Sequence, residues 1–137
     1  MGKLSGLLLF APVEVVRAVL PEMIERGDGA VLLTYGSSAV QPMPHFSGVG
    51  PVVSAARNYL YFLNTELADT GVYPGTLAIG AGIARSEPAR AARADARAAF
   101  PMVDPDDLAG CYWDMYTRRD RVEQLYRGAP APQTDAA

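Results

Sequence analysis

Apolar residues recur at helical spacing in the first part of the chain. Between Val13 and Arg26 the apolar positions are three or four residues apart, and the charged positions fall between them. This pattern predicts a helix over 13–26 that ends at Gly27. Pro21 lies inside the pattern and predicts a kink or a local break, because proline has no amide hydrogen and crowds the preceding turn. The apolar run 7–11 fits either an earlier turn of this helix or a short strand.

Three short apolar runs predict the strands of a sheet. Ala30–Tyr35 and Val72–Ile79 are continuous, contain β-branched and aromatic residues and do not alternate, which is typical of strands buried on both faces. Val122–Tyr126 is a shorter candidate. Because helical segments separate these runs, we expect an α/β fold with a small parallel sheet. Its edge strands would be apolar, which indicates that the sheet is part of something larger.

Further helices are expected between and after these strands. A loop rich in Gly, Ser and Pro over 36–50 leads to Pro51, which begins a helix over 51–67. The apolar residues of this helix form a seam with alternating spacings of three and four residues: Val53, Ala56, Leu60, Leu63 and Leu67. Asp104–Asp107 is a second strong helix start, and Leu108, Tyr112 and Met115 would face inward from it. Segment 86–100 is helical by composition, whereas 128–137 is predicted to be a disordered tail after a single domain over 1–127.

Composition narrows the class of protein. The chain has 137 residues, of which 50% are hydrophobic, and a net charge of −3, so we expect one globular domain and no nucleic-acid partner. No apolar run is long enough for a membrane span, and the first residues resemble a signal peptide only loosely, so a cytoplasmic location without membrane partners is expected. Single Cys and His residues (Cys111 and His45) leave no disulfide and no metal cluster. Of the 12 basic residues, 11 are Arg, and Lys3 is the only lysine.

An ordered set of segments resembles the short-chain dehydrogenase/reductase family. Arg17–Met23 looks like the end of a long family helix, Arg26–Ser38 like the turn and strand that lead to the catalytic serine, and Arg57–Leu67 like the end of the catalytic helix. Val72–Gly80 looks like the next strand and Asp104–Ala109 like a late helix. The resemblance covers roughly residues 8–127 and implies the C-terminal half of a Rossmann-like, doubly wound parallel sheet with flanking helices. It also implies NAD(P) as cofactor and an oxidoreductase ancestry.

The chain departs from the family at the residues that carry the chemistry. Ser37 stands at the place of the catalytic serine, and the Tyr and Lys expected thirteen and seventeen residues later are Gly50 and Ser54. Counting back from Glu66 instead places Val49 and Val53 there, and Leu8 replaces the expected Asn. In this family the Tyr donates a proton to the developing alkoxide and the Lys lowers its pKa. The resemblance therefore implies a degenerate active site, and the Gly-rich cofactor loop would lie before residue 1.

Two residues are candidates for the remaining site. Ser37 is a candidate catalytic position and Gly80, after the second strand, a candidate cofactor-binding position. Plain turns at the strand ends are the simpler interpretation of both. The resemblance implies a homo-oligomer, or pairing with a related subunit, through helices 13–26 and 51–67. We therefore expect a truncated, catalytically impaired relative of the family. The alternatives are a non-catalytic pseudoenzyme that dimerises or binds a ligand beside a full-length subunit, and a reductase whose start is mis-assigned.

Overall fold

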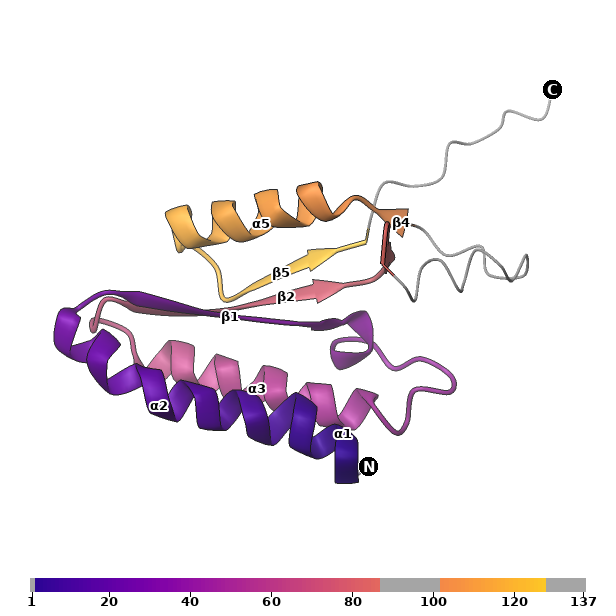
Figure 1. Ribbon diagram of the computed structural model, residues 1–137, viewed down its shortest axis with the longest axis horizontal. Helices are drawn as coiled ribbons and strands as arrows, with labels where there is room; N and C mark the ends of the chain where they lie inside the picture. Colours follow the sequence, from indigo (N-terminus) through magenta and orange to yellow (C-terminus); the bar gives the residue numbers. More distant parts are fainter. Residues whose placement is uncertain (1, 87–101, 128–137) are drawn as a thin grey trace.

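Three parallel strands form the centre of the fold. The computed structural model describes residues 2–86 and 102–127. Strands β1 (Gly29–Gly36), β2 (Val72–Ile79) and β5 (Glu123–Tyr126) lie in the order β1-β2-β5, and both pairs are parallel. Helices cover both faces of this sheet (Figure 1). The expected α/β class, a parallel sheet with flanking helices, is confirmed.

The N-terminal segment is helical throughout. Helix α1 (Gly2–Ser5) passes through a π-helical turn, η1 (Gly6–Phe10), into α2 (Ala11–Arg26), so the apolar run 7–11 is not a strand. The break expected at Pro21 is wrong, because α2 continues through this residue and ends at Gly27 in a left-handed conformation (φ 70°). Pro21 is exposed, so water can solvate the carbonyl group that loses its partner in the preceding turn.

Strand β2 is the most enclosed element of the molecule. All eight of its residues are buried, and its full length pairs with β1, from Gly29 opposite Val72 to Gly36 opposite Ile79. Strand β5 pairs with the second half of β2 on the other side. The continuous apolar pattern of the second predicted strand is explained by this central position, because both of its faces are covered.

The helices divide between the two faces of the sheet. Helices α2 and α3 (Gly50–Glu66) lie on one face, and α5 (Pro105–Arg118) lies on the other (Figure 1). The predicted seam of α3 faces the sheet, and every residue of it is buried. Helix α5 begins as predicted, with the Asp104 carboxylate accepting a hydrogen bond from the Asp106 amide at 2.8 Å. Leu108 and Met115 of α5 are buried against the sheet.

A second, very small sheet was not predicted. Strands β3 (Gly82–Ile83) and β4 (Met102–Val103) form a parallel pair beyond the end of β2. Strands of two residues carry no periodicity, so no pattern in the sequence could indicate them. The helix expected over 86–100 and the tail expected over 128–137 lie outside the described residues, apart from Ser86.

Candidate functional site

A pocket opens at the carboxyl end of β1. After Gly36 the chain makes a 3-10 turn, η2 (Ser37–Ala39), and then loops back to begin α3. The pocket between this loop and α3 has a volume of about 440 Å³. Its lining is largely apolar, with serine hydroxyl groups as polar points: Ser38, Pro42, Met43, Pro44, His45, Phe46, Ser47, Gly50, Pro51 and Ser54. The carboxyl ends of parallel strands are where sheets of this kind bind ligands.

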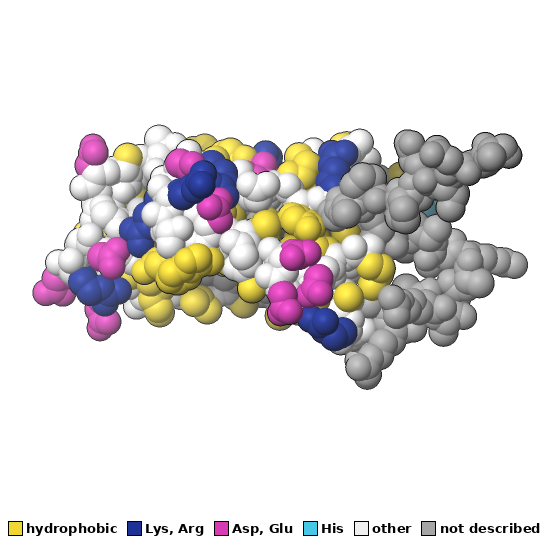
Figure 2. All heavy atoms as spheres, turned by 90° about the horizontal axis from the view of Figure 1, so that it is seen from above, with side chains coloured by type: hydrophobic (Ala, Val, Ile, Leu, Met, Phe, Trp, Pro, Cys, Tyr) yellow, Lys and Arg dark blue, Asp and Glu magenta, His cyan; other side chains and the backbone are white. Residues whose placement is uncertain are grey.

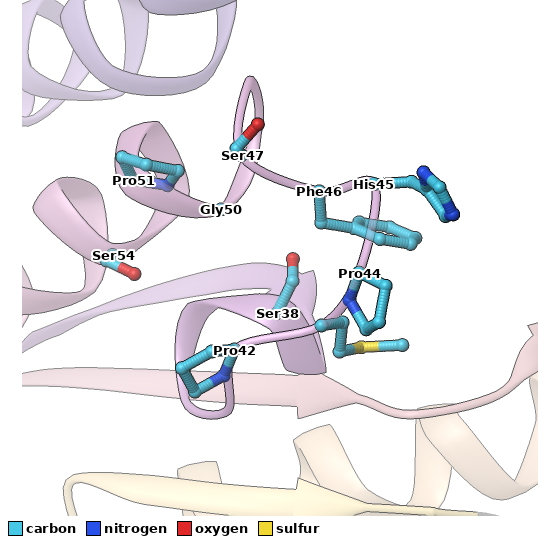
Figure 3. Close-up of a pocket in the computed structure, with 10 residues that line it drawn as sticks. Ser38, Pro42, Pro44, His45, Phe46, Ser47, Gly50, Pro51 and Ser54 are labelled. Carbon is cyan, nitrogen blue, oxygen red and sulfur yellow. The ribbon is translucent and has the colours of Figure 1, made fainter.

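The structure brings the two predicted site residues, Ser37 and Gly80, close together. They follow the paired ends of β1 and β2, and a Cβ atom added to Gly80 would lie 3.3 Å from Ser37 Oγ. The Ser37 hydroxyl contacts the Met43 sulfur atom at 3.9 Å. Ser38, rather than Ser37, lines the pocket, and Figure 3 shows it between the loop and the start of α3.

The two ways of counting toward the expected Tyr and Lys positions lead to different places in the structure. Gly50 and Ser54 both line the pocket, where a Cβ atom on Gly50 would lie 3.6 Å from the Ser38 carbonyl oxygen. The Ser54 hydroxyl donates to the carbonyl oxygen of Ala39 at 3.0 Å. Val53 is instead buried in the core with Val49 packed against it, so neither side chain position faces the pocket. The two positions given by counting from Ser37 therefore line the pocket, and the two given by counting from Glu66 do not.

The remaining substituted position lies away from the pocket, whereas the only histidine of the chain lies at its rim. Leu8 is part of the helical turn η1 and packs against the core cluster that contains Tyr35 and Val53. His45 lies in the loop with a left-handed backbone (φ 69°), and its ring points outward from the pocket (Figure 3). Apart from His45, the lining consists of serine hydroxyl groups and groups without an acidic proton, which can hold a neutral ligand but are poor proton donors at neutral pH.

A polar cluster that the sequence analysis missed lies farther along α3. Arg57 binds Glu123 of β5 through two hydrogen bonds, from Nε to Oε1 at 2.7 Å and from Nη2 to Oε2 at 3.0 Å. The hydroxyl groups of Tyr35 and Tyr61 donate to the same carboxylate at 3.0 and 2.8 Å. The Thr76 hydroxyl approaches it at 3.4 Å. Sixty-six residues separate Arg57 from Glu123, so no local motif could reveal the pair.

This cluster holds its tyrosines in the protonated form. The pKa of Tyr35 is raised, mainly because the phenol is buried. A hydrogen bond with Thr76 lowers this pKa, and the neighbouring Glu123 carboxylate raises it further. Burial and Glu123 likewise raise the pKa of Tyr61. A catalytic tyrosine of a reductase needs the opposite shift. The cluster is therefore built to fix α3 against the sheet, and its phenol groups are not activated acids.

No resident group is indicated by the donor atoms of the described residues. Residues 2–86 and 102–127 contain no cluster of three His, Cys, Asp or Glu side chains that could hold a metal ion. In this part of the chain no strand leads through a Gly-rich turn directly into a long helix, which is the usual cradle for a dinucleotide pyrophosphate. A Cβ atom on Gly80 would lie 3.3 to 3.5 Å from side-chain atoms of Ser37 and Arg127, so the absence of a side chain leaves room for these two neighbours. The described residues do not by themselves form a complete dinucleotide site.

Comparisons with known proteins place the fold. No family model and no curated protein matches the sequence. Among solved structures, the chain is similar to a gluconate 5-dehydrogenase from Burkholderia cenocepacia J2315 in complex with NADP and tartrate (TM-score 0.77, 20% identity, 88% of this chain and 52% of that chain). It is also similar to a short-chain dehydrogenase from Streptomyces avermitilis (TM-score 0.73, 21% identity, 90% and 51%). The fold is that of short-chain dehydrogenases.

A third solved structure is also similar to this chain. It is an NADPH-bound short chain oxidoreductase from Pseudomonas aeruginosa PAO1, described as containing an atypical catalytic center (TM-score 0.60, 26% identity, 69% of this chain and 37% of that chain). The present chain spans about half the length of the first two of these solved chains and less of the third. In the part of the chain that the structure describes, no helix is long and apolar enough to cross a bilayer.

Proposed function

We propose that this chain is an NAD(P)-linked oxidoreductase homologue of the short-chain dehydrogenase type with impaired catalysis. The observation that carries the proposal is the pocket at the carboxyl end of β1, in which Gly50 and Ser54 stand at the expected Tyr and Lys positions. Reduction of a carbonyl group needs a proton donor at the developing alkoxide. Glycine offers none, and a serine hydroxyl without a cationic neighbour is too weak an acid.

A shift of register does not restore the missing acid. Lys3 is the only lysine in the chain, so no lysine lies near α3 in the sequence. Tyr35 and Tyr61 are bound to Glu123, which raises the pKa of both phenol groups. Ser37, beside Gly80, is the only one of the four expected catalytic positions that keeps the expected residue. We assign Ser37 and Gly80 to ligand contact at the strand ends. We also place the protein in the reducing cytoplasm, with which its one unpaired cysteine is compatible.

NAD(P) is the cofactor that the fold supports. Two of the similar structures are described with NADP or NADPH bound. Ser37 and Gly80 follow the carboxyl ends of β1 and β2, and parallel sheets of this kind bind ligands at that edge. The cofactor would supply the hydride for a carbonyl reduction. The residues described for this chain offer one part of the required contact surface, so we expect weak binding of NADPH and NADH by this chain alone.

Turnover and binding measured on the same protein test this proposal. We expect no oxidation of NADPH or NADH above the blank with aldehydes and ketones of several sizes, together with weak or undetectable binding by calorimetry. The double variant Gly50→Tyr, Ser54→Lys introduces the expected Tyr and Lys side chains into the pocket. The control variant Ala55→Tyr, Asn58→Lys introduces the same two residues at exposed positions of α3. Clear turnover by the unmodified chain would refute impaired catalysis, and tight NADPH binding would refute the incomplete cofactor site.

A second candidate function is that of a non-catalytic partner protein. Helices α2 and α3 expose large apolar side chains, with Val15 and Phe62 each 61% exposed. Apolar grooves of about 340 and 320 Å³ lie beside α2 along β1. Such surfaces favour association. This supports pairing with a second copy or a related subunit through the helices expected for that role, 13–26 and 51–67.

The exposed aromatic residue on α3 tests this second candidate. Phe62→Glu should weaken association with a second copy or with a full-length short-chain dehydrogenase, because it places a charge in an apolar contact. Val40→Glu is the matched control, since Val40 is also an exposed apolar residue but lies outside these helices. Light scattering after size exclusion gives the mass of each variant. This function would be contradicted if the unmodified chain and the Phe62→Glu variant were both monomeric and neither bound a full-length short-chain dehydrogenase.

A further inference from the structure

An arginine at the carboxyl edge of the sheet has no acidic partner among the described residues. Of the arginines that the structure describes, only Arg26 and Arg127 form no ion pair with another described residue. Figure 2 views the molecule from the α5 side and shows that most basic side chains on this face lie beside acidic ones. Arg127 makes one long hydrogen bond, from Nη2 to Gln41 Oε1 at 3.4 Å. Because a guanidinium carries several N–H donors, the others are left without a protein acceptor in this part of the chain.

Backbone pairing fixes this arginine beside the two predicted site residues. The Gly80 amide donates to the carbonyl oxygen of Tyr126 at 2.8 Å, which holds the end of β5 against the end of β2. Arg127 follows directly. A Cβ atom added to Gly80 would lie 3.4 Å from Arg127 Cγ and 3.3 Å from Ser37 Oγ. The arginine stem and the half-buried Ser37 hydroxyl group therefore approach the same point at the ends of the strands.

Two contacts join this edge to the pocket at the end of β1. Ser37 Oγ contacts the sulfur atom of Met43 at 3.9 Å, and Met43 lines the pocket. Gln41, which accepts the hydrogen bond from Arg127, directly precedes Pro42, another lining residue. The guanidinium of Arg127 therefore lies next to the loop that forms one wall of the pocket.

The pocket offers an apolar space without negative charge. None of the described residues that line it is Asp or Glu, and its polar side chains are serines and His45. Figure 3 shows the Ser38 hydroxyl group pointing into the space between the loop and the start of α3. The volume of about 440 Å³ is within the range of small-molecule pockets. Such a space suits the apolar part of a ligand, and a guanidinium at its edge suits an anionic head group.

We propose that this edge binds a small carboxylate, with its apolar part in the pocket and its carboxylate group on Arg127. The guanidinium is a planar fork that matches the two oxygen atoms of a carboxylate. The Ser37 hydroxyl group is placed to donate to the same head group. One arginine and one hydroxyl group match a carboxylate better than a phosphate, which carries more charge and more acceptor oxygen atoms. Arg127 thus selects an anionic ligand over a neutral one, which adds the class of ligand to the edge on which the proposed function rests.

Octanoate and octanol test the charge preference, because they have alkyl chains of the same length and differ in charge. Calorimetry on the full chain, without a nicotinamide cofactor, should show tighter binding of octanoate. Arg127→Gln should weaken octanoate binding by about tenfold or more, because it removes charge-assisted hydrogen bonds, and should leave octanol binding unchanged. Arg26→Gln is the matched control and should change neither. Arg26 also forms no ion pair with a described residue, but it lies near the amino end of β1 and donates to the carbonyl oxygen of Asp28.

Two further measurements locate the ligand and its head group. In nuclear magnetic resonance, octanoate should shift the amide signals of Ser37, Gln41 and Gly80 and leave that of Arg26 in place. Arg127→Lys should recover only part of the lost affinity, since an ammonium group keeps the charge but lacks the fork. The proposal would be overturned if octanoate bound no more tightly than octanol, if Arg127→Gln did not weaken its binding, or if the shifts lay on another surface. Tighter binding of octyl phosphate than of octanoate would overturn the choice of a carboxylate.

This experiment and the test of the proposed function have separate outcomes. Turnover or tight NADPH binding would refute impaired catalysis or the incomplete cofactor site, and neither is measured with octanoate. Octanoate binding that depends on Arg127 would stand even if the chain proved to be an active reductase. Conversely, a chain that binds no octanoate could still lack turnover, so failure of the carboxylate site leaves the catalytic proposal as it is.

Discussion

At the scale of single residues, one carboxylate organises the contact between α3 and the sheet. Glu123 is 15% exposed and accepts hydrogen bonds from Arg57, Tyr35 and Tyr61. Burial alone would raise the pKa of Glu123, but these hydrogen bonds outweigh it and lower the pKa below its ordinary value. The carboxylate therefore stabilises the fold in its charged form, and it links the edge strand β5 to a helix that also forms the pocket.

Removing this charge should destabilise the protein. Glu123→Gln keeps the size of the side chain but leaves the half-buried Arg57 guanidinium without a carboxylate partner. We expect the free energy of unfolding at neutral pH to fall by about 2 kcal/mol, below the range for fully buried pairs because Arg57 is partly exposed. Glu22→Gln, on the exposed side of α2, is the control and should change it by less than about 0.5 kcal/mol. Urea unfolding monitored by circular dichroism measures both.

The same variant should show a defined pH dependence. Because the pKa of Glu123 is lowered in the folded protein, its stabilisation is complete above the ordinary glutamate pKa, about 4.3. It is lost as the pH falls through the lower, folded value. The difference in unfolding free energy between the original protein and Glu123→Gln should therefore be constant near neutrality and shrink in acid. A difference that grows with acidification would contradict this assignment of the charge.

At the scale of elements, local patterns were sufficient where one signal dominates. The seam of α3, the buried run of β2 and the Asp104 cap of α5 were each read from neighbouring residues, and each is confirmed. Of the kink or break expected at Pro21, the break is wrong, because the effect of proline depends on solvent exposure, which the sequence does not show. Strands β3 and β4 are too short to carry a pattern.

The site was predictable only in part. The order of helices and strands indicates a parallel sheet, in which neighbouring strands end at the same edge. A site at the carboxyl end of β1, with Ser37 close to Gly80, is consistent with that topology. The sequence left two registers open for the expected Tyr and Lys positions, since a shift of one residue moves both. Only the tertiary packing shows that Gly50 and Ser54 line the pocket whereas Val53 is buried in the core. The cluster around Glu123 needed the tertiary fold, because its members come from three strands and a helix.

At the scale of the whole molecule, the sheet has a protected centre and open sides. Strand β2 is paired on both sides, whereas β1 and β5 each pair with one strand among the described residues. Beside β1 lie the two apolar grooves, which Leu7, Pro12 and Leu33 help to line. An unpaired parallel edge with an apolar border favours association. The two similar dehydrogenase structures match this chain over only about half of their own length.

Hydrogen exchange should show whether this edge is free in solution. In a parallel edge strand, successive amide groups point alternately toward the neighbouring strand and away from it. We therefore expect the β1 amides to alternate between slow and fast exchange. In β2, which is paired on both sides, every amide that bonds to a neighbouring strand should exchange slowly; Pro74 has no amide hydrogen. Residue-resolved nuclear magnetic resonance gives the rates. Uniform protection along Gly29–Gly36 would contradict a free edge and indicate that another strand covers it. Dilution then separates the two sources of such a strand, because protection by a second copy is lost on dilution and protection from within the chain is not.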